Sequence, residues 1–329
     1  MTRSSRKRET LPYGTHGANT FADLIHSCAR FVTRGARSVF PDFIQYKSGN
    51  AAIWIDRRFA DKHFIDRLAD ADTLFAEPLA SVVKDQKKIK VGRIKLQVAG
   101  AAHSLYIKRY NAFSLRYKLV SPLMRSGAFR ALEGAAILRA ADIPIAAPIA
   151  AVENRRRGAL IKSFFLSEEI VGGKTIDAYW RDELMKVVGR EGRMSRRRFL
   201  DELAGLFALL HGRDIYHNDL KDANILAVAD HSNLSLRLFL LDLEGVRRYK
   251  SLGPARRVKN LVQLNRTFGR TLRRVDKLIF VKKYLGARFS ERQSKRELIA
   301  GVLFESKRLD GVKSRQTDTY RIGLKASHG

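Results

Sequence analysis

A short polar loop in the second half of the chain carries side chains well suited to chemistry. The loop reads HNDLKDAN from His217 to Asn224 and runs into the apolar pair Ile225-Leu226. A carboxylate such as that of Asp219 can accept a proton from a hydroxyl, and the amide oxygen of Asn224 can bind a hard cation. A rigid loop can direct both side chains to one place. The same residues are also compatible with a polar connection that has no chemical role between a helix and a strand. Residues elsewhere in the chain that could share a site with the loop must distinguish these two interpretations.

Three ionisable side chains outside the loop supply possible partners. Lys108 lies on a predicted strand, and Asp242 follows the buried strand Phe239–Leu241. Glu133 lies in the middle of a predicted helix and is the only acid in the stretch 109–141, so it can pair with Lys108. Each of these residues can also be explained without a chemical role, because a lysine on a strand or a glutamate on a helix is usually solvated. Their order along the chain, and the kind of strand or helix on which each lies, favour a common site.

In that order, these residues resemble the signature of the protein kinases. The loop is similar to the kinase catalytic loop H-x-D-L-x-x-x-N, Lys108 to the strand lysine of V-A-I-K, and Asp242 to the aspartate of D-F-G. The resemblance implies that Asp219 orients or deprotonates an acceptor hydroxyl and that Asn224 and Asp242 bind Mg²⁺. It also implies that Lys108, held by Glu133, neutralises phosphate charge of ATP.

The surrounding patterns predict a bilobal protein-kinase-like fold of the α+β class. Strand alternation between residues 79 and 110, a helix around 129–138 and strands at 149–152 and 160–166 predict an N-lobe with an antiparallel sheet and a helix C. We divide the chain into a disordered basic tail (1–19), an N-terminal extension packed on the N-lobe (20–78), the N-lobe (79–167), a hinge (168–173), a mostly helical C-lobe (174–305) and a basic C-terminal tail (306–329).

The hinge should also bind the nucleotide. An extended connector before the glycines Gly172 and Gly173 can hydrogen-bond adenine through its main chain, and Glu168 and Ile170 are the residues placed to do so. Beyond the hinge, the helix 199–211 is apolar nearly all round and should be buried as it delivers the chain to the polar loop.

Other elements are expected without a chemical role. The pattern predicts a helix over 20–40, a strand at 51–55 and a helical stretch over 59–75. A further helix is expected at 297–304, before a frayed tail. We interpret Trp180 and His211 as packing residues.

A closer resemblance is to the lipopolysaccharide kinases that phosphorylate Kdo or heptose in the inner core. It covers roughly residues 82–285 and is carried by segments 106–110, 141–148, 217–226, 241–249 and 256–261. It implies an ATP- and Mg²⁺-dependent phosphotransferase that acts on a sugar hydroxyl, with a lipopolysaccharide core or lipid-linked sugar as acceptor.

Two departures from the protein-kinase pattern bear on this interpretation. No G-x-G-x-x-G precedes Lys108; only Gly92 lies between the first two strands. The lysines near it offer a charge that could replace the missing glycine loop: Lys84, Lys87, Lys88 and Lys90. Glu244 replaces the glycine of D-F-G, and no A-P-E follows. An activation segment of the regulated kind is therefore not expected, which disfavours a Ser/Thr/Tyr protein kinase.

The charge balance favours an anionic partner. The chain has 63 Lys+Arg against 33 Asp+Glu, a net charge of +30. Many of these cations follow Asp242 on a predicted amphipathic helix, which either docks on an anionic membrane or is merely solvated. A single cysteine, Cys28, excludes an intrachain disulfide, and no apolar run is long enough to span a bilayer. We expect a cytoplasmic protein, peripheral at the inner face of the inner membrane.

Two rival interpretations stay open. The first is a kinase with a protein or small-molecule acceptor, because the motifs define the ATP side better than the acceptor side. The second is a pseudokinase that binds RNA or an anionic membrane, which the missing glycine loop would allow. Nucleic acid is less favoured as a partner than a glycolipid, but it is not excluded.

Overall fold

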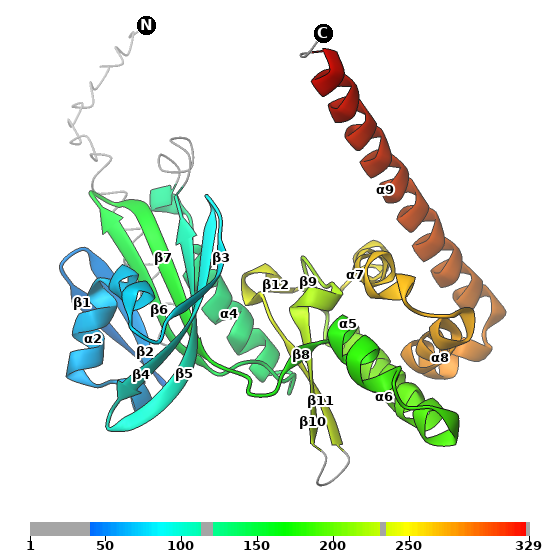
Figure 1. The fold of residues 1–329 in the computed structure, drawn as a ribbon, viewed down its shortest axis with the longest axis horizontal. Coiled ribbons are helices and arrows are strands. Elements are labelled where there is room, and N and C mark those ends of the chain that lie inside the picture. Colours follow the sequence, from blue (N-terminus) through cyan, green and yellow to red (C-terminus); the bar gives the residue numbers. More distant parts are fainter. Residues whose placement is uncertain (1–39, 113–120, 231–234, 327–329) are drawn as a thin grey trace, which may run out of the picture.

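A seven-stranded antiparallel sheet forms the N-terminal lobe (Figure 1). The computed structural model describes residues 40–112, 121–230 and 235–326. Within these residues the strand order is β1-β2-β6-β7-β5-β4-β3. The strands are β1 Phe43–Ser48, β2 Ala51–Asp56, β3 Ser81–Asp85, β4 Ile89–Val98, β5 Ala101–Asn111, β6 Pro148–Arg156 and β7 Ala159–Glu168.

The first two strands correct the predicted domain layout. Residues 43–56, which we assigned to an extension packed on the lobe, are instead part of its sheet, because β2 pairs with β6 from Ala51 opposite Asn154 to Ile55 opposite Ala150. The expected helical stretch over 59–75 comprises α2 (Lys62–Ala69) and the 3₁₀ segment η2 (Ala71–Ala76). The predicted tail 1–19 and most of the predicted helix 20–40 lie outside the described residues.

The two faces of the sheet bury different cores. Successive side chains of a strand point to opposite faces. Phe164 on β7 packs into one cluster with Phe64 and Leu68 of α2, whereas Phe165 packs into the other cluster with helix α4 (Gly127–Arg139). Helix α4 is the predicted helix C, and Ser126 caps its N-terminus by accepting a hydrogen bond from the Phe129 amide.

The C-terminal lobe is mostly helical, as predicted. A three-stranded sheet has the order β11-β10-β8, and a two-stranded ribbon pairs β9 with β12. The elements of this lobe include β8 (Lys174–Thr175), α5 (Ile176–Tyr179), the π-helical turn η4 (Trp180–Leu184), α6 (Gly189–Gly212), β9 (Ile215–His217), β10 (Ile225–Asp230), β11 (Ser235–Leu240), β12 (Val246–Arg248), α7 (Pro254–Arg266) and α8 (Arg274–Leu285).

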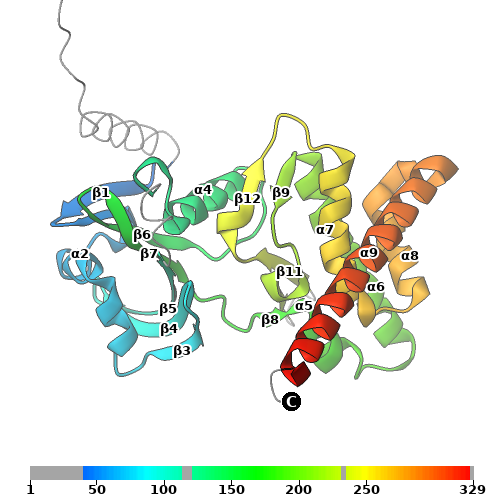
Figure 2. The same ribbon diagram turned by 90° about the horizontal axis from the view of Figure 1, so that it is seen from above.

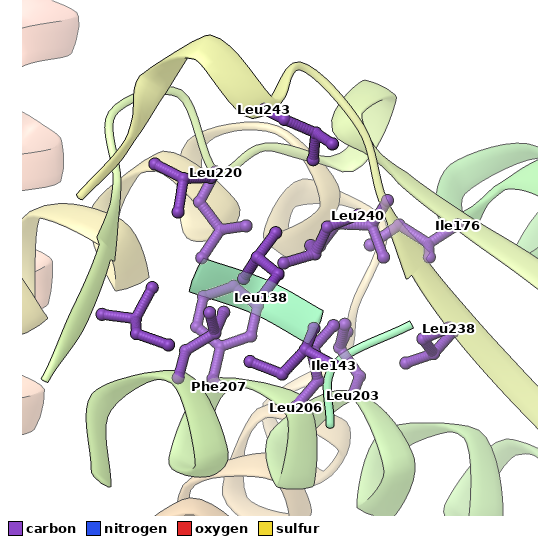
Figure 3. Packing of buried hydrophobic residues seen from close by; sticks show 14 of the residues in the cluster. Leu138, Ile143, Ile176, Leu203, Leu206, Phe207, Leu220, Leu238, Leu240 and Leu243 are labelled. Carbon is purple, nitrogen blue, oxygen red and sulfur yellow. The ribbon is translucent and has the colours of Figure 1, made fainter. Parts of the chain in front are cut away.

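Helix α6 joins the two lobes through a shared core. Leu203, Leu206 and Phe207 of α6 meet Leu138 of α4 and Leu240 of β11 in one cluster (Figure 3). All five side chains are buried, so the helix that precedes the polar loop is fixed against both lobes. Trp180 contributes to this core as predicted, because its ring packs against the rings of Phe199 and Phe268.

The last helix differs from the expectation. Instead of a short helix at 297–304 and a frayed tail, α9 runs from Arg292 to Ala326 and projects away from the lobe (Figure 1). Its first half is attached to α7, because Asn265 donates to Ser306 and Arg266 pairs with Asp310. Within the described ranges, no helix combines the length and the apolar character required to cross a bilayer.

Candidate active site

The ribbon of β9 and β12 connects the polar loop to the segment that follows Asp242. His217 lies opposite Val246 in this antiparallel pair, and the Asn218 amide donates to the Gly245 carbonyl at 3.0 Å. The Leu241 amide donates to the Asn224 carbonyl at 2.9 Å. The two segments that the sequence predicts to carry the chemistry are therefore hydrogen-bonded to each other at both ends of the loop.

His217 holds the same two segments together from inside. Its Nδ1 accepts from the Asp219 amide at 3.2 Å, and its Nε2 lies 2.9 Å from the Leu241 carbonyl. These partners require a neutral ring that carries its proton on Nε2. Burial lowers the pKa of His217, which favours this neutral form. The histidine of the loop therefore positions Asp219 rather than exchanging protons with a substrate.

Asp219 is surrounded by a lysine and an amide of its own loop. Lys221 Nζ lies 2.6 Å from the Asp219 carboxylate, and Asn224 Nδ2 donates to the Asp219 carbonyl at 2.7 Å and to its carboxylate at 3.1 Å. The Asp219 side chain is 42% exposed, so an incoming hydroxyl can reach it. The sequence pattern did not single out Lys221, although its place two residues after Asp219 is a signal that could have found it.

Side chains of helix α7 hydrogen-bond to the main chain of the loop. Asn260 donates to the His217 carbonyl at 2.6 Å, and Gln263 donates to the Asn218 carbonyl at 2.5 Å while accepting from the Leu220 amide at 3.0 Å. His211, interpreted from the sequence as a packing residue, is buried and also hydrogen-bonds to Asn260 and Tyr284. A loop tied at this many main-chain groups is held in one conformation.

Asp242 and Lys108 meet across the two lobes. Lys108 on β5 places Nζ 2.5 Å from Asp242 Oδ1, and both side chains are largely buried. Asp242 has φ of 57° and ψ of 49°, the left-handed conformation, which a non-glycine residue adopts at some cost. The strand before it is fixed by the Leu240 amide, which donates to the Pro144 carbonyl of the α4–β6 connection. The predicted juxtaposition of Lys108 and Asp242 is therefore present.

The predicted pair of Glu133 and Lys108 is not formed. The Glu133 carboxylate pairs with Arg125 instead, because it lies on the side of α4 where Arg125 precedes the helix. Besides Asp242, the carboxylate beside Lys108 is that of Glu244, whose oxygens lie 3.6 Å from Lys108 Nζ and 3.6 Å from Arg130. Burial, with Asp242 nearby, raises the pKa of Glu244. In sequence, Glu244 stood out only as a departure from D-F-G.

A glycine lets helix α4 approach the Asp242 turn. A Cβ built on Gly134 would lie 2.1 Å from the Leu243 carbonyl oxygen, a contact that no side chain tolerates. Leu243 to Gly245 form the 3₁₀ turn η6, which directs Asp242 and Glu244 to Lys108. The close approach of α4 thus fixes the turn that carries both acids.

The expected hinge begins where β7 ends. The Glu168 amide donates to the Ala147 carbonyl at 2.8 Å, so this amide is not available to a purine. The Ile170 carbonyl accepts from the Gly173 amide at 3.1 Å, and within the described residues the Ile170 amide has no backbone acceptor. The assignment of adenine contacts to Glu168 and Ile170 stays a prediction.

The glycine between the first two predicted strands has a packing explanation. A Cβ on Gly92 would lie 2.9 Å from the Phe75 ring, so the absence of a side chain accommodates that ring. Of the nearby lysines, Lys90 pairs with Asp85 and lies over the same Phe75 ring. The suggested replacement of a glycine-rich loop by these lysines stays a prediction.

The donors around Asp242 fit a magnesium ion. Asn224 turns its amide nitrogen to Asp219, which leaves its oxygen for a cation, and Asp242 uses one carboxylate oxygen for Lys108. Across residues 40–112, 121–230 and 235–326, no group of three or more His, Cys, Asp and Glu side chains could hold a metal by itself. Mg²⁺ does not require one, because it keeps waters and substrate phosphates among its ligands.

Comparison with known proteins identifies the family. A sequence model of the lipopolysaccharide kinase (Kdo/WaaP) family matches residues 75–285. Among solved structures, the chain is similar to WaaP in complex with acyl carrier protein, with 17% identity, a TM-score of 0.55, and coverage of 74% of this chain and 92% of that chain. None of the curated proteins matches.

The two likenesses carry different weight. At this identity the WaaP structure supports the fold alone, and it confirms the predicted protein-kinase-like architecture. The family match covers most of the chain, including Lys108, the polar loop and Asp242. This chain therefore belongs to the lipopolysaccharide kinase (Kdo/WaaP) family and is a kinase that phosphorylates sugars of the lipopolysaccharide core.

Proposed function

We propose that the chain transfers the γ-phosphoryl group of ATP to a hydroxyl of Kdo or heptose in the lipopolysaccharide inner core, with Asp219 at the acceptor. The supporting observation is that His217 hydrogen-bonds both to the Asp219 amide and to the Leu241 carbonyl next to Asp242. One buried ring thereby couples the residue for the acceptor to the residue for the nucleotide phosphates.

Asp219 orients the acceptor hydroxyl and accepts its proton as the oxygen attacks phosphorus. The exposed carboxylate is available for this contact, and Asn224 holds it in place. Lys221, already 2.6 Å from the carboxylate, moves its ammonium toward the transferring phosphoryl group as the hydroxyl binds. Positioned cations of this kind stabilise the charge on the equatorial oxygens.

Lys108 binds the phosphates of ATP on the other side of the site. Asp242 and Glu244 both pair with its ammonium. Asn224 and Asp242 would hold Mg²⁺, which would supply charge neutralisation at the phosphates. Lys108 would bind the nucleotide phosphates, and Glu244, which lies 3.6 Å from both Lys108 and Arg130, would hold its ammonium in place.

The basic surface beyond Asp242 supports docking at the inner face of the inner membrane, where lipid-linked acceptors are reached. Each lysine or arginine near an anionic bilayer contributes about 1 kcal/mol to binding. Such cations recur from Arg247 to Lys283. The chain would thus be a peripheral cytoplasmic enzyme.

The function is tested by mass spectrometry of lipopolysaccharide from cells with and without the gene for this chain. We expect loss of one phosphate from one core sugar, restored by the wild-type protein and not by Asp219→Ala. An unchanged core, or rescue by Asp219→Ala, would contradict the proposal. Purified protein with labelled ATP and a panel of protein, nucleotide and glycan acceptors separates it from a kinase of another acceptor class.

A further inference from the structure

The ribbon of β9 and β12 has an outer face that the proposed chemistry does not use. Paired residues of an antiparallel ribbon share a face, and the next residue points the other way. Val246 and His217 are paired and buried on the inner face. Tyr216 is paired with Arg247, so both lie on the face opposite to His217, and Tyr249 follows on the same side with its ring 6.4 Å from that of Tyr216.

Helix α7 brings two cations to these rings. Figure 2 shows α7 beside β9, and contacts between the two elements agree with this view. The Arg256 guanidinium lies 4.1 Å from the centre of the Tyr249 ring, and Lys259 Nζ lies 5.8 Å from the centre of the Tyr216 ring. A ring beneath a guanidinium fixes its plane and leaves its N–H groups for a bidentate anion.

These cations differ from others on the same part of the chain. Arg257 pairs with Asp214, Arg266 and Arg270 with Asp310, and Arg273 with Asp276. In contrast, the described part of the chain provides no carboxylate partner for four neighbouring cations: Arg248, Lys250, Arg256 and Lys259. A local excess of unpaired positive charge attracts an anionic ligand.

A buried hydroxyl in the cluster lacks a partner. Tyr216 is 6% exposed, and its hydroxyl is one of the few buried polar atoms in the described residues without a hydrogen bond. Buried hydroxyls are normally satisfied, so an unsatisfied one suggests a missing ligand. Lys259 Nζ lies 5.8 Å from the centre of this ring, so a ligand bound by the lysine would lie close to the tyrosine.

The cluster adjoins the acceptor side of the active site. Tyr216 precedes His217 on the strand that leads into Asp219, and Lys259 lies one turn before Gln263, which binds the Asn218 carbonyl. The side chain of Asn218 is exposed between the two. A sugar whose hydroxyl contacts Asp219 would therefore have its neighbouring sugar near the cluster.

We propose that Tyr216, Tyr249, Arg256 and Lys259 form an acceptor subsite that binds a carboxylate or phosphate on the sugar adjacent to the one phosphorylated. This inference rests on the proposed function. Arg256, held flat by Tyr249, forms paired hydrogen bonds to the anion, Lys259 supplies a second charge, and the Tyr216 hydroxyl donates to a sugar oxygen. No bond is made or broken at this subsite.

Kinetics of Arg256→Gln and Lys259→Gln test the subsite. With ATP and an inner-core lipopolysaccharide acceptor, we expect the acceptor KM to rise by about 10- to 100-fold, because a hydrogen bond to a charged group is lost. The KM for ATP and the unfolding midpoint should not change. Arg193→Gln, which removes an exposed cation on α6, is the matched control and should leave both KM values unchanged.

Direct binding separates this inference from the proposed function. Calorimetric titration uses the full-length protein and two probes: deacylated inner-core oligosaccharide freed of phosphate, and the same oligosaccharide with phosphates kept but carboxyl groups reduced. Loss of affinity for one probe assigns the anion. If the wild type binds a probe and Arg256→Gln binds it more weakly, the subsite is supported even if no phosphoryl transfer occurs.

Two results would overturn the subsite. One is equal affinity of the wild type, Arg256→Gln and Arg193→Gln for both probes, and the other is absence of binding by the wild type. Tyr216→Phe removes only the hydroxyl and should fold as well as the wild type. Its acceptor KM is expected to rise about threefold to tenfold. This variant therefore still tests the subsite if a charge variant fails to fold.

Discussion

Asp219 is not isolated in its loop, because Lys221 and Asn224 both contact its carboxylate. The roles predicted for Asp219 and Asn224 follow from the resemblance of the loop to the kinase catalytic loop. It could not predict which other loop residue turns toward the carboxylate, since that depends on the main-chain path, which is set by His217 and by Gln263 of α7.

Lys221→Met tests the contribution of the loop lysine. The substitution removes the ammonium but keeps much of the side-chain length. We expect kcat to fall by about 100-fold, because one positioned donor to the transferring phosphoryl group is lost, with little change in the KM for ATP. Lys62→Met, at an exposed position of α2, is the control. Equal kcat for both variants would show that Lys221 does not act on the transition state.

Glu244→Gln and Glu133→Gln decide which acid serves Lys108. Glu244 contacts the ammonium, whereas Glu133 pairs with Arg125, so we expect the KM for ATP to rise about tenfold in Glu244→Gln and by less than about twofold in Glu133→Gln. Steady-state kinetics with varied ATP make the comparison. The reverse ranking would restore the role that the sequence assigned to Glu133, and would mean that nucleotide binding rearranges α4.

At the scale of elements, helix α4 positions the acids by close approach. The sequence located this helix and its glutamate correctly, because apolar spacing identifies a helix face. It did not predict that the turn after Asp242 would pack on Gly134, since that contact joins segments far apart in the chain. The partner of a charged side chain is decided by such packing, and the expected Glu133–Lys108 pair was wrong for this reason.

Gly134→Ala should therefore damage the site. The new Cβ meets a backbone carbonyl, so the η6 turn must shift, and we expect a loss of about 1–3 kcal/mol in the free energy of unfolding together with a higher KM for ATP. Gly205→Ala on α6 is the matched control. Its Cβ has nothing within 4 Å, and we expect it to stabilise the protein by about 0.5–1 kcal/mol. Equal effects of the two variants in urea denaturation would contradict the close approach.

The β1–β2 hairpin illustrates the limit of local patterns. The strand at 51–55 was predicted from its composition, but its membership of the N-lobe sheet depends on pairing with β6. The sequence of neither strand shows which strand it pairs with, because the alternation of apolar and polar residues defines the two faces of a strand and not its neighbours. For the same reason the continuous helix α9 was underestimated: its attachment to α7 through Asp310 is a tertiary contact.

At the scale of the whole molecule, the two lobes, the family and the order of the kinase motifs could be predicted from the sequence. The kinase motifs are local, and their order along the chain is enough to identify the fold. The recognition of the acceptor could not be predicted in this way. Lysines and arginines are spread along the chain, and only their ion pairs separate the unpaired cations beside β9 from those bound to Asp214, Asp276 or Asp310.

Stability should depend on pH through the buried polar network of the C-lobe. Burial lowers the pKa of His211 from 6.5 to about 4. Between these values the unfolded chain binds a proton that the folded ring does not, so stability falls as the pH falls, by up to about 3 kcal/mol at pH 4. His217 acts in the same direction, because burial also lowers its pKa.

Urea unfolding at pH 7.5 and pH 4.5 measures this dependence. His211→Gln keeps a polar side chain next to Asn260 and Tyr284 but removes the titrating group, so the difference in unfolding free energy between the two pH values should shrink. His63→Gln, at an exposed position of α2, should keep the wild-type difference. A His211→Gln protein with the full wild-type difference would show that this histidine is not held neutral.

The most direct test of the account is transfer of labelled γ-phosphoryl from ATP to an inner-core lipopolysaccharide acceptor by purified protein. The account predicts that the wild type phosphorylates a core sugar hydroxyl and that Asp219→Ala, folded to the same unfolding midpoint and still binding ATP, is slower by about 1,000-fold. Transfer at the wild-type rate by folded Asp219→Ala would contradict the assignment of this loop as the catalytic centre.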